Sequence, residues 1–211
     1  MSISEMTPVE FWEKLMGLTN WKLINMLGKD SRIEKITRGE LLAEQNQRME
    51  DVPFLISGVA KGYWRDEYQK EHLFCFGYLP GTPLTAITSL EKETISLCNI
   101  EIAREGQALF VPVKRLYELV QSELDASRLY SSLLEKSFQE MVERAQVTYS
   151  LPAAQRYRWF RNRYPGLEQW ITGKDVASFL HLAPASLSRL KGRFQAEDER
   201  ATAAEQTVGD K

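Results

Sequence analysis

Apolar and polar positions follow a β-type pattern through the middle of the chain. Short alternating runs cover residues 32–37, 52–57, 59–64, 72–78, 94–102 and 108–113. Turn-forming residues separate them, for example at 57–58, 80–81 and 104–106. Short strands with turn signals at this spacing predict an antiparallel barrel or sandwich.

The N-terminal residues follow a helical pattern instead. Thr7 can cap a helix that opens with Pro8, and Glu10 completes a capping box. A second short helix is expected over residues 20–27, with Gly28 as its stop signal. The first helix has one apolar face, formed by Phe11, Trp12, Leu15 and Met16.

After Pro112 the pattern becomes helical and stays so. Apolar or small residues recur with a 3,4 spacing, as in the seam of a two-stranded coiled coil. Because several of these positions hold Ser or Thr, a second interpretation stays open, namely an amphipathic helix packed on its own β-domain. We favour a dimer interface built from Leu124, Leu134, Phe138 and Met141. The whole seam comprises Tyr117, Val120, Leu124, Ser127, Ser131, Leu134, Phe138, Met141, Ala145 and Thr148.

The segment 172–194, TGKDVASFLHLAPASLSRLKGRF, predicts two short helices joined by a three-residue break at 181–183. Pro184 can open the second helix, and Ala177 provides the small residue where the helices touch. His181 stands at the turn position that glycine often fills. The inner face of the second helix would hold Leu187, Leu190 and Phe194. This spacing predicts a helix-turn-helix, although an ordinary helical hairpin would show a similar pattern.

The outer face of the second helix carries side chains suited to nucleic acid. Ser186, Ser188 and Arg189 would face base edges in the major groove of double-stranded DNA. Lys174, Lys191 and Arg193 would contact phosphates. The charge supports this, because residues 151–195 carry 8 Lys/Arg and 2 Asp/Glu, whereas the 211-residue chain has a net charge of −2. A solvated basic surface is the alternative.

Composition excludes several classes of protein. The chain is 43% hydrophobic and 27% charged, which is typical of a globular protein, and we expect it in the cytoplasm without signal peptide or membrane span. Two cysteines and two histidines are too few for an iron–sulfur cluster or a multi-histidine metal site. We expect no metal and no enzymatic activity, because no catalytic motif is present.

The order of these parts resembles the Crp/Fnr transcription regulators. The similar segments are TRGELL at 37–42, FLISGVAKGY at 54–63, PAAQRY at 152–157, YPGL at 164–167, ASFL at 177–180 and SLSR at 186–189. The resemblance implies a cyclic-nucleotide-binding-like β-roll, a long dimerisation helix and a DNA-binding head. It also makes RNA polymerase a further candidate partner.

The sequence departs from that family at three places. No acid follows Pro80, and Ser96 stands near the position of the phosphate-binding arginine, so we do not expect cyclic AMP to bind. Cys75 and Cys98 cannot form an oxygen-sensing cluster and are expected to be small buried side chains. Pro184 and Ala185 replace the early Arg-Glu pair of the recognition helix, and no wing is visible after it.

We therefore expect an α+β fold: an N-terminal antiparallel, jelly-roll-like β-roll, a long dimerisation helix and an all-α C-terminal helix-turn-helix domain. The expected boundaries are 1–120 for the sensor domain, 121–150 for the helix, 151–195 for the DNA-binding domain and 196–211 for a polar, disordered tail. The expected function is that of a homodimeric transcription regulator. The alternative is a ligand-binding signalling protein whose helical domain docks a protein partner.

Overall fold

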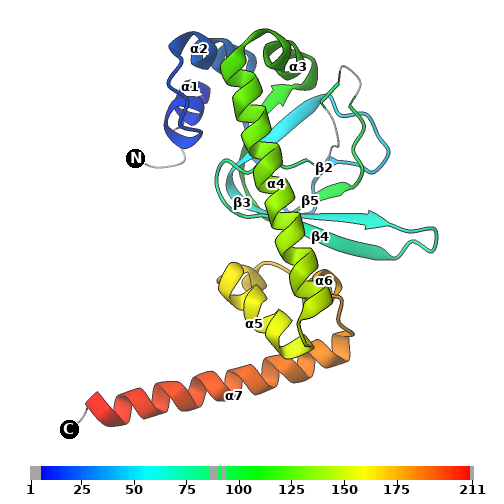
Figure 1. The fold of residues 1–211 in the computed structure, drawn as a ribbon, viewed down its shortest axis with the longest axis vertical. Helices are drawn as coiled ribbons and strands as arrows, with labels where there is room; N and C mark the ends of the chain where they lie inside the picture. The colour runs from blue at the N-terminus through cyan, green and yellow to red at the C-terminus, as the bar shows by residue number, and fades with distance from the viewer. Residues whose placement is uncertain (1–5, 86–89, 92–93, 210–211) are drawn as a thin grey trace. The chain divides into compact units, whose positions relative to one another are not determined.

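The computed structural model describes the backbone of residues 6–85, 90–91 and 94–209, and side chains as far as residue 197. The chain divides into two compact units, residues 1–142 and 143–211 (Figure 1). The first contains the expected β-domain and most of the long helix, and the second contains the helix-turn-helix. The long helix therefore belongs to both units, whereas the sequence predicted it as a separate segment. In the described residues no helix is both long enough and apolar enough to cross a membrane.

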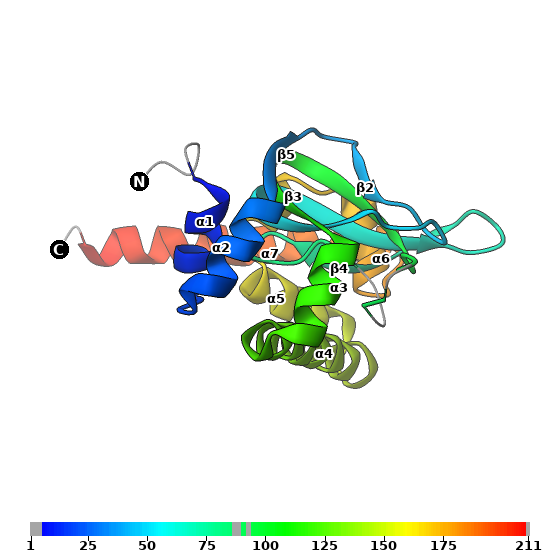
Figure 2. The ribbon, with the colours of Figure 1, turned by 90° about the horizontal axis from the view of Figure 1, so that it is seen from above.

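The first unit is built on one antiparallel sheet, which confirms the predicted α+β class. The strands are β1 (Arg32–Ile36), β2 (Leu41–Ala43), β3 (Asp51–Arg65), β4 (Glu71–Gly77) and β5 (Asn99–Pro112). Their order is β1-β5-β3-β4, and β2 also pairs with β5. The sheet is strongly bent, and the hairpin of β3 and β4 projects from one side of it (Figures 1 and 2).

Two predicted turns are bends within long strands. β3 runs through Ser57-Gly58 and β5 runs through residues 104–106, with shifts of register where the two strands pair. Gly58 has a φ of +107°. A Cβ on Gly106 would lie 2.0 Å from the carbonyl oxygen of Ser57, so the two backbones approach more closely than side chains would allow. The predicted runs 52–57 and 59–64 therefore form the single bent strand β3, and the runs 94–102 and 108–113 contribute to the single bent strand β5.

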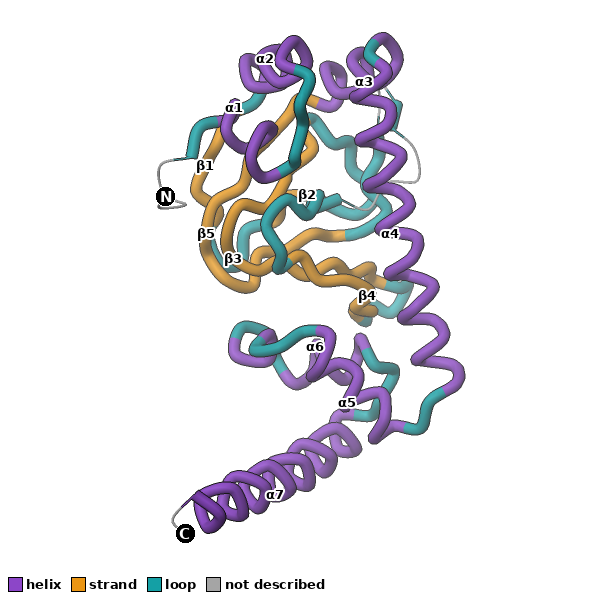
Figure 3. Tube along the Cα trace, turned by 60° about the vertical axis from the view of Figure 1, so that its left-hand side comes forward, coloured by secondary structure: helices purple, strands orange, loops and turns teal. Residues whose placement is uncertain are grey.

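Helices cover one end of the sheet (Figure 3). They are α1 (Pro8–Glu10), a π-helical turn η2 (Phe11–Leu15) and α2 (Trp21–Asp30). Thr7 and Glu10 form the predicted capping box. The fully buried rings of Phe11 and Trp12 meet Phe54 of β3 edge-on, at centroid distances of 6.0 and 5.3 Å. The predicted apolar face therefore joins the N-terminal helices to the sheet.

Gly28 does not end the second helix, contrary to the sequence prediction. The helix continues to Asp30. A Cβ on Gly28 would lie 2.7 Å from Cγ2 of Val9, so glycine is required here for close approach of the two helices and not as a stop signal.

The part of the chain that carries the predicted seam, residues 113–150, forms two helices, α3 (Val113–Ser122) and α4 (Leu124–Ser150). Glu123 separates them with extended dihedral angles, φ −118° and ψ 118°. α3 buries Val113, Leu116 and Leu119 against the β-domain. The predicted seam is therefore interrupted, and only its part after Glu123 lies on α4.

The second unit is helical. It comprises α5 (Ala153–Arg163), the 3-10 turn η3 (Leu167–Gln169), α6 (Gly173–Phe179) and α7 (Pro184–Gly209). Residues 196–209, predicted to be a disordered tail, continue α7 as helix (Figure 3). Their alanines, glutamates and glutamine favour helix, which outweighs the polar composition on which the prediction relied. No strand follows α7 within the described residues, so the structure describes no wing there.

Candidate nucleic-acid interface

Both helices of the predicted helix-turn-helix are present, and the second begins at the predicted residue but continues beyond the predicted segment, to Gly209. Thr172 caps α6 and completes a capping box with Asp175, and Pro184 is the first residue of α7. His181 adopts φ +52°, the left-handed conformation expected at the turn position. The amide of Leu182 donates to the carbonyl of Ala177 at 2.8 Å, which closes the C-terminal turn of α6. A short turn over residues 180–183 therefore connects α6 to α7.

The turn is also held from outside by α5. Nη1 of Arg156 donates to the carbonyl oxygens of Leu180, at 2.7 Å, and of His181, at 3.3 Å. These carbonyls end α6, and a guanidinium there satisfies them and complements the negative end of the helix. Arg156 lies in the family-like segment 152–157, and nothing near it in the sequence predicts a partner 24 residues away.

The inward positions pack largely as predicted. Ala177 is buried at the contact between the helices, and Leu187 and Phe194 of α7 are buried as well. Leu190 is half-buried. The ring of Phe194 meets Tyr157 of α5 edge-on at a centroid distance of 5.3 Å. This core fixes which side of α7 remains outward.

The side chains predicted to read bases lie on the outward side of α7. Ser188 and Arg189 are exposed, and Ser186 is half-buried. Nε of Arg189 makes a long contact of 3.4 Å with the carbonyl oxygen of Ala185 and no ion pair within the described residues. The guanidinium of Arg189 is thus presented to solvent on the second turn of the helix.

The three predicted phosphate contacts differ in their surroundings. Lys174 is exposed near the start of α6. Arg193 is exposed and lies 3.5 Å from Glu197 one turn further along α7. Nζ of Lys191 instead lies 2.6 Å from Oε1 of Glu168, whose other oxygen accepts a hydrogen bond of 3.0 Å from the Tyr157 hydroxyl. Lys191 therefore links α7 to η3, a structural contact that the sequence analysis did not anticipate.

The four residues predicted to form the dimer interface lie exposed on α4. The exposed fractions are 65% for Leu124, 39% for Leu134, 61% for Phe138 and 59% for Met141. The first part of the seam differs, because Tyr117 and Val120 of α3 pack against the core of the β-domain. The apolar stripe left uncovered in a single chain therefore begins at α4.

The β-domain has no cation at the position where the resemblance implies one. Ser96 is fully buried, and its hydroxyl donates to the carbonyl oxygen of Cys98 at 2.7 Å. Arg104 lies exposed on β5, at the bend opposite Val59. Cys98 is buried as predicted, and burial raises the pKa of its thiol, whereas Cys75 is only half-buried.

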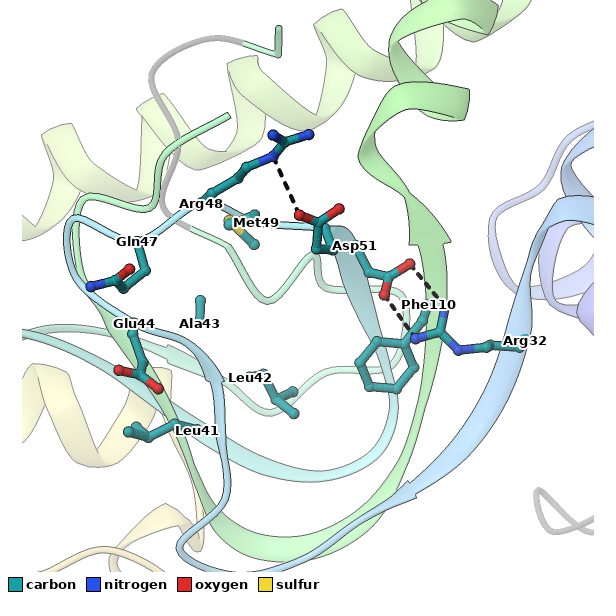
Figure 4. A pocket seen from close by; sticks show the side chains of 11 residues that line it. Arg32, Leu41, Leu42, Ala43, Glu44, Gln47, Arg48, Met49, Asp51 and Phe110 are labelled. Atoms are coloured by element: carbon teal, nitrogen blue, oxygen red, sulfur yellow. Dashed lines mark hydrogen bonds and ion pairs between the residues drawn. The ribbon is translucent and has the colours of Figure 1, made fainter. Parts of the chain in front are cut away.

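A hollow of about 390 Å³ lies elsewhere in the β-domain, between β1, β2 and the start of β3 (Figure 4). Four of its charged side chains form two ion pairs. Arg32 donates two hydrogen bonds to Asp51, at 2.8 and 2.7 Å, and its guanidinium stacks over Phe110. Arg48 lies 3.3 Å from Glu50. Ser96 does not line this hollow. Within the described residues, no group of three histidine, cysteine or acidic side chains could hold a metal ion.

Comparison with known proteins finds similarity in structure only. No model of a protein family and no curated protein matches the sequence. FixK2 from Bradyrhizobium japonicum superposes with a TM-score of 0.68 and 13% identity, over 80% of this chain and 86% of that chain. A candidate transcriptional regulator of the Crp/Fnr family from Eubacterium rectale superposes with a TM-score of 0.68 and 13% identity, over 87% of each chain. The c-di-GMP-responsive global regulator CLP of Xanthomonas campestris superposes with a TM-score of 0.63 and 14% identity, over 84% of this chain and 92% of that chain. With an antiparallel β-domain, a long helix and a C-terminal helix-turn-helix in this order, the chain has the fold of the Crp/Fnr regulators.

Proposed function

We propose that the protein is a homodimeric, DNA-binding transcription regulator that acts in the cytoplasm by binding and not by catalysis. The observation that carries this proposal is the outward presentation of Ser188 and Arg189 on a helix held by a helix-turn-helix turn. A helix of this kind fits the major groove, where an arginine can donate two hydrogen bonds to a guanine edge. The excess of basic residues in this unit supplies attraction to phosphates.

The homodimer is supported by the uncovered stripe on α4. Phe138 and Met141 expose more than half of their surface on a helix of 27 residues. Pairing two such stripes would remove this apolar area from water, a gain of about 25 cal/mol per Å² buried. Two recognition helices in one dimer would then read half-sites about one helical turn of DNA apart, so we expect a near-palindromic operator. On DNA, RNA polymerase is the partner through which such a regulator would act.

We propose further that the β-domain does not bind cyclic AMP. A cyclic phosphate removed from water needs a cation or several N–H donors, and the buried hydroxyl of Ser96 provides neither. Solved structures of this fold include a c-di-GMP-responsive regulator, so ligands other than cyclic AMP are compatible with the fold. Titration calorimetry with cyclic AMP and cyclic GMP should show no saturable heat up to millimolar ligand. Micromolar binding would overturn the proposal.

The DNA-binding function is tested with fluorescently labelled duplexes. The parent protein should bind random duplex in a strongly salt-dependent manner, and selection from a random library should enrich one near-palindromic sequence. Arg189→Ala should weaken binding to the selected sequence roughly ten- to hundredfold while leaving scrambled duplex nearly unaffected. Arg128→Ala, which removes an exposed arginine from α4, serves as the charge-matched control.

Two outcomes would contradict this assignment. Absence of salt-dependent binding to any duplex would favour the alternative, a signalling protein whose helical unit docks a protein. An equal loss of affinity for selected and scrambled duplex in Arg189→Ala would make Arg189 a phosphate contact, and the base-reading residues would have to be sought elsewhere on α7.

A further inference from the structure

Three arginines gather around one aromatic ring in the helical unit. The guanidinium carbons of Arg158, Arg161 and Arg193 lie 5.3, 5.6 and 5.7 Å from the centroid of the Phe194 ring. Arg158 and Arg161 come from α5 and Arg193 from α7. Phe194 itself is 5% exposed, so the ring is covered, whereas Arg158 and Arg193 are exposed and Arg161 is half-buried. We call these three side chains the arginine cluster.

The arginine cluster concentrates positive charge. Each guanidinium gains about 0.5–2 kcal/mol from the aromatic ring, but three like charges gathered around one ring repel one another. Glu197 lies 3.5 Å from Arg193, whereas Arg158 makes no ion pair with a carboxylate of the described residues. An anion placed above the ring would be attracted by all three groups, and guanidinium groups bind phosphate with good hydrogen-bond geometry.

The arginine cluster adjoins the proposed reading face of α7. Arg193 follows Arg189 by four residues, which places it about 6 Å further along the helix and rotated by only about 40°. Both side chains are exposed. Where Arg189 enters a major groove, the next part of the same face meets the sugar–phosphate backbone that borders the groove.

We infer that the arginine cluster is a phosphate clamp for the DNA backbone, in which Arg158 and Arg161 of α5 act together with Arg193. This inference rests on the proposed DNA-binding function and extends it to a helix outside the helix-turn-helix. Phosphates carry no sequence information, so the clamp strengthens binding to every duplex and does not choose among sequences.

The experiment compares salt dependence. Binding of the full-length parent, Arg158→Gln and Arg158→Lys to the selected and to a scrambled duplex is measured at several salt concentrations. Each phosphate contact contributes about 0.9 to the slope of log K against log salt, so Arg158→Gln should make the slope shallower by roughly two in a dimer. The loss should be the same for both duplexes. Arg158→Lys retains the charge and should keep most of the slope.

Controls separate the clamp from the fold and from the proposed function. Arg128→Gln removes the same charge from α4 and should leave the slope unchanged. Thermal unfolding of each variant shows whether the helical unit remains folded. A parent that binds no duplex refutes the proposed function and the clamp together. A parent that binds normally, with an unchanged slope in Arg158→Gln, refutes the clamp alone and leaves the arginines as a cover for Phe194.

Discussion

Arg156 of α5 donates a hydrogen bond of 2.7 Å to the carbonyl oxygen of Leu180, the C-cap residue of α6. Through this bond α5, which precedes the helix-turn-helix, fixes the turn between α6 and α7. We expect Arg156→Ala to destabilise the helical unit by about 1.5–3 kcal/mol, the cost of losing a hydrogen bond to a charged donor. Chemical unfolding followed by circular dichroism measures this. Arg158→Ala, on the same helix without such a bond, should cost much less.

Lys191 is expected to act on stability as well as on DNA binding. Its ammonium lies 2.6 Å from Glu168, and both side chains are partly buried. Lys191→Ala should lower the free energy of unfolding by about 1 kcal/mol, because it leaves the carboxylate of Glu168 without its cation. Lys174→Ala removes an equally charged but exposed side chain and should change stability by less than about 0.5 kcal/mol. Equal effects of the two changes would mean that the contact with Glu168 contributes nothing.

Phe138→Glu should convert the dimer into a monomer. The change places a charge in the centre of the apolar stripe on α4, at a cost of several kcal/mol if the charge is buried without a partner. Analytical ultracentrifugation of the parent should show a dimer and that of the variant a monomer. The neighbouring exposed residue supplies the control, since Gln139→Glu adds the same charge beside the stripe. A parent that stays monomeric at high concentration would contradict the proposed homodimer.

Gly106→Ala should destabilise the β-domain by several kcal/mol. The added methyl group would lie 2.0 Å from the carbonyl oxygen of Ser57, a backbone atom that cannot move without opening the pair of β3 and β5. Gly192→Ala is the comparison, because its Cβ would meet nothing within 4 Å and alanine favours helix. We expect Gly192→Ala to raise the thermal midpoint of unfolding slightly and Gly106→Ala to lower it by many degrees.

Acid should weaken the N-terminal capping box. Hydrogen bonds from Lys14 and then from Thr7 lower the pKa of Glu10 from 4.5 to about 2. The unfolded chain therefore binds more protons between these two values, so the contribution of Glu10 to stability is complete above about pH 5 and is lost as the pH falls towards 2. Urea midpoints of the parent and Glu10→Gln should differ at neutral pH and converge near pH 2. Glu13→Gln removes a carboxylate outside the capping box and is the control, because its urea midpoint at neutral pH should stay close to that of the parent.

Local signals predicted the elements well where the local sequence decides the structure. The capping box at Thr7, the start of α7 at Pro184 and the left-handed His181 all depend on a few neighbouring residues. Such features can be read from sequence because their partners lie within one turn.

The structural features that the sequence did not predict depend on contacts between residues that are distant along the chain. Gly58 and Gly106 are ordinary turn signals on their own, and they become bends only because β3 and β5 pack against each other there. Gly28 is an ordinary helix stop unless Val9 packs against it. The arginine cluster likewise needs α5 and α7 side by side, so no spacing along the chain indicates it.

The central place of β5 in the sheet has a consequence for how the protein folds during synthesis. β5 pairs with β1, β2 and β3, and among the described strands the hairpin of β3 and β4 is the one pair that does not involve it. Asp51 of β3 can pair only after Pro112 of β5 has been synthesised, and Arg32 of β1 only after Phe110 of β5. The β-domain therefore cannot form its sheet until residues 99–112 have left the ribosome, whereas the helical unit, made later, folds through contacts between neighbouring helices. Long-range pairing of this kind folds slowly, so the part of the chain synthesised first is expected to be completed late.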